Sequence, residues 1–410
     1  MTPGRFDAAI TGVGLVTSAG VGAAAAWERI LLGSATAATK VPALAGTPAD
    51  FGCQADGFDA IAALGKRTAW RLDRSTQMAM AAAAEALADS GLDPARWNGE
   101  RVAVVLGNGI GGAAAWEKQH NVLRDNGPLE VSPMLIPMLS MNMSAGYVAI
   151  QCGAKGPSLV TATACASGTT AVGVARDLLR NDRCDVVITG GTEACLVPSI
   201  ISGFSQMGAL SARGDEMDVA SRPFDVDRDG FVPAEGAAVL VLERVADARA
   251  RGARIHACVS GYGASADAHH PTAPDPDGAG AELAVLAALR DAQIGAGEVD
   301  HVNAHGTSTP LNDVAEARMI RRVLGDRPAV TSIKGVVGHA LGAAGAIEAV
   351  ATALTVRDRL IPPTANLDNI APEIEVDVVA KIAREATVDV AVSNSFGFGG
   401  QNAVLVLTRP

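Results

Sequence analysis

Residues 238–244 read Ala238-Val239-Leu240-Val241-Leu242-Glu243-Arg244, and residues 403–409 repeat them almost unchanged as Ala403-Val404-Leu405-Val406-Leu407-Thr408-Arg409. Both runs are continuously apolar and follow a segment that contains glycine, which is typical of β-strands buried on both faces. A whole strand that recurs in this way predicts an internal duplication of the chain.

Three further landmarks repeat in the same order, which argues against chance. In these three landmarks, a segment of the first half corresponds to a similar segment of the second half: Ile10–Gly14 to Val259–Gly263, Val102–Gly109 to Val299–Gly306, and Cys165–Gly168 to His339–Gly342. The chain has 410 residues, more than one ordinary hydrophobic core holds. We therefore predict two α/β halves, residues 1–250 and 251–410, each a mixed sheet with helices, joined through one continuous interface.

Two amphipathic helices are predicted from the periodicity, over residues 176–183 and 315–324. Asn312-Asp313 precedes the second of them and is a plausible N-terminal cap, because short polar side chains accept hydrogen bonds from the first turn of a helix. The first half carries the longer insertions between its landmarks.

The composition is that of a globular protein and excludes some partners. The net charge is -11, and aromatic residues make up 3% of the chain. Phosphate binding needs clustered Lys and Arg, and base stacking needs aromatic platforms, so nucleic acid is not expected as a partner. Met1–Asp7 shows no signal pattern and apolar stretches such as Met78–Ala84 are short, so we expect a cytoplasmic protein without a membrane span.

Six cysteines occur without a Cys-x-x-Cys pair or a metal-ligand spacing, so no metal site is predicted from them. We expect reduced thiols, five of them as small buried hydrophobic residues. Only Cys165 has a different context. It stands where the strand-like run 160–164 turns into a helix of small residues, and a helix N-terminus lowers the pKa of a thiol.

Small residues around Cys165 would let a thioester approach the backbone closely. The amide of Cys165 and one amide from the Gly397–Gly400 loop could then form an oxyanion hole. Taken alone, the alternative of an inert buried cysteine would be favoured. Two histidine motifs, Val302–Thr309 around His305 and Ser332–His339, weigh against that alternative, since each histidine adjoins a glycine that permits tight backbone.

These segments, together with Asn394–Asn402, resemble in their order the β-ketoacyl-acyl carrier protein synthases, specifically the elongating type II class, over nearly the whole chain. The resemblance implies a duplicated thiolase-like fold with five α-β-α-β-α layers. It also implies an acyltransferase: an acyl group moves onto Cys165, malonyl-acyl carrier protein loses CO2, and the carbanion attacks the acyl-cysteine. His305 and His339 would stabilise the enolate as N–H donors.

Further roles follow from the resemblance. Lys334 would be a buried ammonium near Glu316 that orients the histidine; a surface ion pair of little value is the alternative. Phe398, between flanking glycines that include Gly399, would gate the acyl-cysteine, or else be a structural plug. Substrate-binding positions are implied for Ile110, Thr272, Thr307 and Thr309. The run Gly107–Gly112 around Ile110 lacks the acidic residue of a dinucleotide fingerprint and is predicted to line the acyl channel near a dimer interface.

The implied chemistry needs no metal or organic cofactor, because the phosphopantetheine of an acyl carrier protein holds the substrates. That carrier is acidic, and three basic residues at helical spacing could steer it: Arg67, Arg71 and Arg74. A solvated helix face explains the three residues equally well.

Several alternatives stay open at this stage. A thiolase would need a second catalytic cysteine late in the chain, and only Cys258 lies in the second half. A non-catalytic chain-length subunit would lack Cys165. A homodimer and a heterodimer with a related ketosynthase-like subunit are not separated. Departures from the family pattern at Gly208, Pro271 and Gln401 leave primary fatty-acid synthesis and a specialised polyketide or polyene pathway both open.

Overall fold

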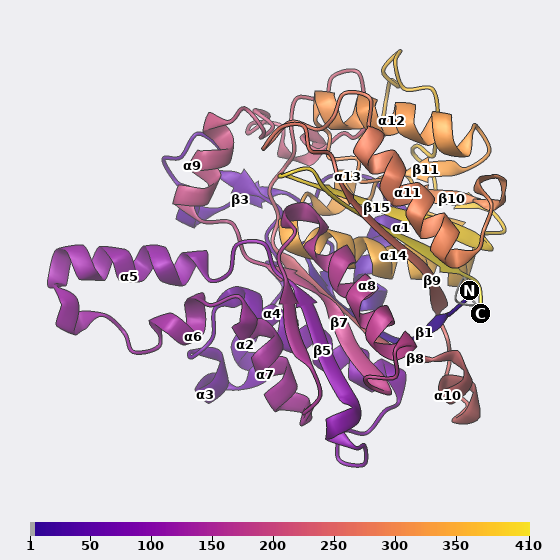
Figure 1. Ribbon diagram of the computed structural model, residues 1–410. Coiled ribbons are helices and arrows are strands. Elements are labelled where there is room, and N and C mark those ends of the chain that lie inside the picture. Colours follow the sequence, from indigo (N-terminus) through magenta and orange to yellow (C-terminus); the bar gives the residue numbers. More distant parts are fainter. Residues whose placement is uncertain (1–4) are drawn as a thin grey trace.

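The computed structural model describes residues 5–410, in which two sets of paired strands lie between layers of helices (Figure 1). Residues 1–4, part of the N-terminal segment considered for a signal, lie outside the described residues. In the first half the strand order is β6 (Ser158–Thr161), β5 (Val102–Gly107), β7 (Val186–Glu193), β8 (Gly236–Arg244) and β1 (Ala8–Thr17).

The second half repeats this order strand for strand. It runs β11 (Ala329–Thr331), β10 (His301–Asn303), β15 (Val390–Gly397), β16 (Gln401–Thr408) and β9 (Ala257–Ala266), with β13 (Asp377–Val378) added beyond β11. In each half the first three strands are parallel and the next two pairings are antiparallel. β8 and β16 hold the repeated sequence with which the duplication was predicted, so the duplication is confirmed.

The two sets of strands join edge to edge through a short antiparallel pairing of β1 with β9, from Ala8↔Val259 to Ile10↔Ala257. The predicted boundary after residue 250 falls between α10 (Val245–Ala250) and β9. Its exact place stays a prediction.

Helices form three layers around the two sets of strands, which confirms the five-layer arrangement (Figure 1). α8 (Ser167–Arg180) and α14 (Ala344–Asp358) lie between the sets. α4 (Arg74–Ser90) and α7 (Asn142–Cys152) cover the outer face of the first set, and α11 (Ala279–Ala292) and α12 (Pro310–Leu324) cover that of the second. Residues 344–356 of α14 are all buried, because that helix has a sheet on both sides and is built mainly from alanine and other small residues.

Glycines let the outer helices approach the sheets, and they do so alike in both halves. A Cβ on Gly14 of β1 would lie 2.1 Å from the carbonyl oxygen of Ala82 in α4, and one on Gly263 of β9 would lie 2.2 Å from that of Ala284 in α11. Only glycine permits such contact between strand and helix backbones. The predicted pairing of 10–14 with 259–263 is therefore confirmed in register.

Another predicted pairing, Cys165 with His339, is wrong by three residues. Each inner helix follows a 3₁₀ turn that opens on a residue with positive φ, Ala164 (φ 49°) before α8 and Leu341 (φ 43°) before α14. This turn fixes the register, so Cys165 corresponds to Gly342. The spacing of small residues alone was too repetitive to show it.

Helix limits also differ from the predictions. α8 begins at Ser167 and ends at Arg180, and α12 begins at Pro310 after the N-cap residue Thr309. Asp313 is inside that helix and accepts the backbone N–H of Phe224 at 2.9 Å, so it is not a cap. Proline at the first helical position, which needs no N–H there, was the signal that the prediction missed.

The remaining elements lie around this framework, and α5 with α6 extends from it as an arm (Figure 1). Among the helices of residues 5–410, none combines the length and apolar character needed to cross a bilayer. These other elements are α1 (Ala23–Leu32), α2 (Ala60–Leu64), α3 (Lys66–Ala69), α5 (Ala113–Asn126), α6 (Leu135–Leu139), α9 (Pro198–Gln206), α13 (Lys334–Val337), β2 (Gly20–Val21), β3 (Thr39–Lys40), β4 (Phe51–Gly52), β12 (Leu360–Ile361) and β14 (Arg384–Glu385).

Candidate active site

Cys165 stands in the 3₁₀ turn between β6 and α8, with 7% of its surface exposed. Ala164 before it adopts the left-handed conformation, which turns the chain sharply from strand to helix. The backbone N–H of Phe398 donates a hydrogen bond to the Cys165 sulfur. The loop after β15 therefore places a second backbone N–H beside the thiol, as the sequence predicted.

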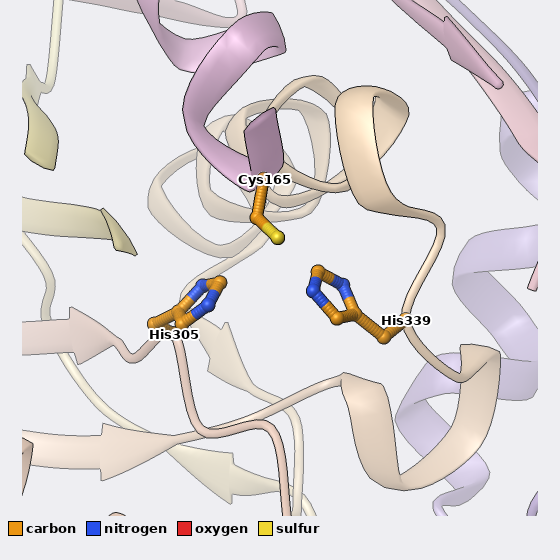
Figure 2. Close-up of side chains that lie close together, drawn as sticks. All are labelled: Cys165, His305 and His339. Carbon is orange, nitrogen blue, oxygen red and sulfur yellow. The ribbon is translucent and has the colours of Figure 1, made fainter. Parts of the chain in front are cut away.

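His305 and His339 lie beside that thiol, and Figure 2 shows the sulfur pointing toward the gap between their rings. The sulfur and one nitrogen of each ring all lie within 4.8 Å of one another. The two rings meet edge to face, with centroids 5.4 Å apart and an interplanar angle of 86°. The structure thus brings together three residues that are far apart in the sequence. A thiol and two imidazoles are also ligands that a soft metal ion accepts.

His305 is held by its backbone and its ring. It follows β10, and its N–H donates to Glu316 at 2.8 Å while the N–H of Gly306 donates to the other oxygen of that carboxylate. Lys334 Nζ lies 3.4 Å from the Nδ1 of His305 and donates to its carbonyl oxygen at 2.6 Å. Nδ1 therefore faces Lys334, and the opposite ring nitrogen is left for Cys165.

The ion-pair partner of Lys334 is Glu348 on α14, and not Glu316 as predicted. Glu316 reaches His305 from α12 on the opposite side of the sheet, where it also accepts from Asn394 at 3.0 Å. Both members of the Lys334–Glu348 pair are 1% exposed. Sequence reasoning missed Glu348, although a single carboxylate in the apolar helix 344–356 was a visible signal, since an isolated buried charge needs a partner.

Burial dominates the electrostatics of the site. It raises the pKa of the Cys165 thiol to about 11, although the Phe398 N–H and the charge of Lys334 lower it. The expected lowering by the helix N-terminus does not prevail over this desolvation. Burial first, and then the Lys334 charge, hold the pKa values of His305 and His339 well below the usual 6.5. Both imidazoles are therefore neutral at pH 7.

His339 is fixed by neighbours that precede it by about a hundred residues. It follows Gly338 (φ 70°), its N–H donates to the carbonyl oxygen of Val232 at 2.8 Å, and its own carbonyl accepts from Ala234. The ring of Phe231 stands edge to face against the imidazole, with centroids 5.2 Å apart. The orientation of His339 thus depends on the segment around Phe231.

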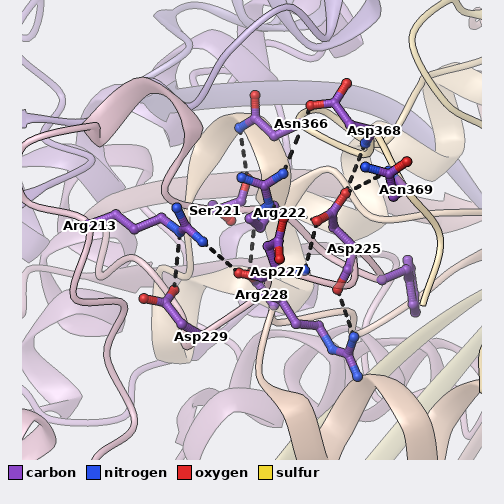
Figure 3. Close-up of polar contacts among 12 residues, drawn as sticks. Arg213, Ser221, Arg222, Asp225, Asp227, Arg228, Asp229, Asn366, Asp368 and Asn369 are labelled. Carbon is purple, nitrogen blue, oxygen red and sulfur yellow. Dashed lines mark hydrogen bonds and ion pairs between the residues drawn. The ribbon is translucent and has the colours of Figure 1, made fainter. Parts of the chain in front are cut away.

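That segment is held by a polar network that sequence reasoning missed (Figure 3). Asp225, which has 0% of its side chain exposed, accepts from Arg222 Nε at 3.0 Å and from the backbone N–H groups of Asp368 and Asn369 at 2.9 Å. Arg228 Nη1 donates back to the carbonyl oxygen of Asp225 at 2.7 Å. The dense alternation of charges in residues 222–229 was the available signal.

A cavity of about 460 Å³ opens above Cys165. Phe398 lines it, and so do all four residues predicted to bind substrate: Ile110, Thr272, Thr307 and Thr309. Gly399 does not line it, but its N–H donates to the carbonyl oxygen of Pro271 at 2.7 Å, which ties the Phe398 loop to the segment that contains Thr272.

Glu193, at the end of β7, supports the wall of this cavity and was not predicted. Its Oε2 accepts the N–H of Gly109 at 2.8 Å and the N–H of Gly342 at 3.2 Å. Burial raises the pKa of this carboxyl to about 8, against the lowering by those N–H donors. Glu193 therefore holds together the loop that contains Ile110 and the turn that follows His339.

The prediction that Arg67, Arg71 and Arg74 share one helical face is wrong. Arg67 is in α3, Arg71 lies in the turn that follows it, and Arg74 begins α4. Arg74 forms an ion pair with buried Glu235 at 2.7 Å, and its side chain is 32% exposed, so its charge is compensated within the protein. Arg67 and Arg71 are exposed and line a second cavity beside Ile150.

Comparison with known proteins agrees with this geometry. Residues 6–248 match the model of the β-ketoacyl synthase N-terminal domain, and residues 256–368 match that of its C-terminal domain. A 3-oxoacyl-[acyl-carrier-protein] synthase 2 of Synechocystis sp. is 46% identical over 88% of this chain and 87% of its own. The protein of the same name from Vibrio cholerae is 40% identical over 98% of both chains.

Two solved structures are similar over 99% of this chain and 100% of their own. One is a type II polyketide synthase acyl-carrier protein in complex with its ketosynthase, at 32% identity and a TM-score of 0.91. The other is the ishigamide ketosynthase/chain length factor, at 34% identity and a TM-score of 0.91.

Proposed function

Since the chain belongs to the β-ketoacyl synthase family, we propose that it condenses an acyl group on Cys165 with malonyl-acyl carrier protein, which extends the chain by two carbons and releases CO2. The observation that carries this proposal is the buried thiol with two neutral imidazoles around it. Neutral imidazoles can donate hydrogen bonds to an oxyanion without adding a charge to be desolvated.

The first half-reaction transfers the acyl group to Cys165. Its sulfur attacks the carrier thioester, and the negative charge of the tetrahedral intermediate develops on the former carbonyl oxygen. The backbone N–H groups of Cys165 and Phe398 are the proposed donors for that oxygen, since the Phe398 N–H already donates to the sulfur and the Cys165 N–H belongs to the nucleophile itself. Phe398 lines the cavity and is proposed as the gate between the two half-reactions.

The second half-reaction uses His305 and His339. Loss of CO2 from the malonyl group leaves an enolate, whose oxygen would receive one N–H from each imidazole. Lys334 fixes the tautomer of His305, because an ammonium beside Nδ1 makes that nitrogen an acceptor and leaves the proton on the other nitrogen. Glu316 positions His305 through its backbone N–H.

We infer that the substrates arrive on an acyl carrier protein, which is acidic, and that exposed Arg67 and Arg71 steer it. The side chains of the site and the carrier's own phosphopantetheine supply the proposed chemistry, so it calls for no resident cofactor. The relatives named 3-oxoacyl-[acyl-carrier-protein] synthase and the ketosynthase solved with its carrier protein support this choice of partner.

A dimer is proposed through the edge of the first set of strands. β6 pairs with β5 on one side and ends the ladder on the other, with Leu159 44% exposed. α7 packs on β6, and the arm of α5 and α6, which joins α7, presents Trp116 and Leu123 to solvent. An open strand edge next to exposed apolar residues is a ready surface for a second subunit, either a copy of this chain or a related ketosynthase-like subunit.

A specialised polyketide or polyene pathway is a second reading. The similarity to a type II polyketide synthase ketosynthase and to the ishigamide ketosynthase/chain length factor favours it, and Gly208, which lines the cavity, is a departure from the elongating pattern that agrees with it. In that case the enzyme would work beside a chain-length partner.

Intact-protein mass spectrometry tests the function. Incubation with an acyl-carrier protein should add one acyl group, and peptide mapping should place it on Cys165. The Cys165→Ala variant should lose both acylation and condensation, whereas Cys184→Ala, which removes a buried thiol beyond the other end of α8, should keep both. Acylation of another cysteine, or condensation by Cys165→Ala, would show that the assignment is wrong.

A further inference from the structure

Glu193, the last residue of β7, joins two parts of the cavity wall that are far apart in the sequence. Its side chain is fully buried. Its Oε2 accepts the backbone N–H of Gly109 at 2.8 Å and that of Gly342 at 3.2 Å, and the N–H of Ile110 also donates to this carboxyl. One side chain thus satisfies backbone donors from both segments.

The first segment is the loop 108–112, in which Gly109 and Ile110 line the cavity above Cys165. A Cβ on Gly109 would lie 2.8 Å from Glu193 Oε2, so the carboxyl lies directly against the backbone of the loop. The bonds from Gly109 and Ile110 attach the loop to the end of β7. The position of Ile110 above Cys165 therefore depends on Glu193.

The second segment is the turn 341–343, which follows His339 and opens α14. Leu341 in this turn has φ 43°, a left-handed conformation that costs energy in a residue with a side chain and persists where surrounding contacts impose it. The next residue, Gly342, is the one that donates to Glu193. Glu193 therefore restrains the strained turn that holds His339 in place.

The two segments meet backbone to backbone. A Cβ on Gly342 would lie 2.4 Å from the nitrogen of Gly109 and 2.7 Å from Glu193 Oε2. Only glycine fits at such a contact. Since no side chain lies between the two segments to absorb a movement, a shift of the loop must displace the turn or break its bond to the carboxyl.

We propose that Glu193 is a positioning residue for both half-reactions, an inference that rests on the proposed function. Through the loop 108–112 it sets how far an acyl chain extends beside Ile110. Through Gly342 it keeps the N–H of His339 in place for the enolate. The fit of the acyl chain and the rate of CO2 release are thus set by one side chain, which itself contacts no reacting atom.

Two conservative variants test the proposal. Glu193→Gln keeps the length and the accepting oxygen, and its amide nitrogen can take the place of Oε1, which has no partner within residues 5–410. Glu193→Asp keeps the carboxyl but withdraws it by about 1.5 Å, which breaks the bonds to both segments.

The two variants should behave differently at pH 7. In Glu193→Asp, decarboxylation of malonyl-carrier protein should fall about tenfold to a hundredfold, because His339 is displaced. Primers beyond the native length limit should then be accepted, because the loop can recede, while acylation of Cys165 by short primers should keep its rate. Glu193→Gln should retain both the decarboxylation rate and the length limit.

Glu243→Asp is the matched control. Glu243 is a carboxyl of β8 with 3% of its surface exposed, and it lies at the opposite end of the same set of strands: it pairs with Val186, whereas Glu193 pairs with Gly236. Shortening it should leave the length limit and the decarboxylation rate unchanged.

Nuclear magnetic resonance follows His339 without turnover. In protein labelled with ¹⁵N-histidine, the imidazole signal that is missing from His339→Ala identifies this residue. The signal should shift in Glu193→Asp and stay in place in Glu193→Gln and Glu243→Asp. This measurement separates the inference from the proposed function, which absence of condensation in the unmodified protein would contradict.

Three results in Glu193→Asp would each overturn the positioning role: an unshifted His339 signal, an unchanged length limit, or equal slowing of acylation and decarboxylation. Should this variant not fold, the pH profile of Glu193→Gln decides. The other titratable groups that interact with the Glu193 carboxyl are Asp73 before α4, Cys165 and Cys195.

Burial raises the pKa of Glu193 to about 8, so the unmodified protein gains a charge near Cys165 as the pH rises through that value. A negative charge there opposes the enolate. Decarboxylation by the unmodified protein should therefore fall above pH 8 relative to Glu193→Gln. Equal profiles of the two proteins would overturn the role.

Discussion

Lys334 and Glu348 show how single residues shape this site. Each is 1% exposed, and a buried ion pair of this kind stabilises little by itself but makes the loss of either partner costly. Burial raises the pKa of Glu348 to about 7, while the Lys334 charge lowers it. Beside His305, the Lys334 charge adds to the effect of burial, which is the larger cause of the lowered pKa of that imidazole.

Replacement of either histidine should separate the two half-reactions. His305→Ala or His339→Ala removes one preorganised donor for the enolate, which typically costs about 10²–10³ in rate. Decarboxylation of malonyl-carrier protein should fall by this factor, whereas acylation of Cys165, which depends on backbone donors, should change far less. Intact mass follows acylation, and trapped CO2 follows decarboxylation. Slow acylation with normal decarboxylation would make the histidines bases for the thiol instead.

Glu193 should make stability depend on pH. Its pKa is raised from 4.5 to about 8, so the folded protein holds this proton over a range in which the unfolded chain has lost it. The resulting stabilisation is complete below about pH 4.5 and is lost as the pH rises through about 8. Glu193→Gln keeps the shape without the titration, so its unfolding free energy relative to the unmodified protein should rise across this range, by roughly 5 kcal/mol at most. Urea denaturation at several pH values measures it; a constant difference would contradict the shift.

At the scale of elements, turns with positive φ place the functional groups. Ala164 and Leu341 open the two inner helices at the centre of the molecule, and Gly306 (φ 34°) and Gly338 (φ 70°) adjoin the two histidines. Such turns stop a strand and begin a helix within few residues, so the side chains at these points face a common space. The sequence reveals them where glycine occupies the position, but not at Ala164 or Leu341.

The loop 108–112 should set the longest acyl chain that the cavity accepts. Asn108 Oδ1 accepts the N–H groups of Ile110 and Gly111, and a Cβ on Gly112 would lie 2.0 Å from the carbonyl oxygen of Met138. Because this loop has no room to recede, Ile110→Phe should shorten the longest primer accepted while short primers still react. Ile110→Val, the matched control, should keep the profile or lengthen it. Mass spectrometry of acylated Cys165 over a primer series gives the answer; an unchanged profile would place the channel elsewhere.

The whole molecule divides the work between its halves. The first half contributes Cys165 and the cavity wall with Ile110 and Glu193, and the second contributes both histidines and the Lys334–Glu348 pair. The two turns that open the inner helices lie together at the centre of the molecule. The two halves nevertheless differ in the contact between the inner helix and the sheet, which is apolar at Val105 of β5 and polar at Asn303 of β10.

The dimer is the prediction that belongs to this scale. Leu159→Lys puts a charge on the open edge of β6, where natural sheets use lysine to prevent pairing, so the protein should sediment as a monomer. Ile382→Lys makes the same change at a residue that is 78% exposed and far from that edge, and it should leave the mass unchanged. A dimer that survives Leu159→Lys would use another surface.

The sequence by itself determined the duplication and singled out Cys165, His305 and His339, which the structure brings together. Strand repeats and glycine-flanked motifs are local patterns that survive in one dimension, because each reports a constraint on its own stretch of backbone. Only the tertiary structure decided which charges meet. Lys334 pairs with Glu348 and not Glu316, and Arg74 pairs with buried Glu235. The pKa of Cys165 rises for the same reason, since desolvation and partner choice depend on what packs around a group and not on its neighbours in the chain.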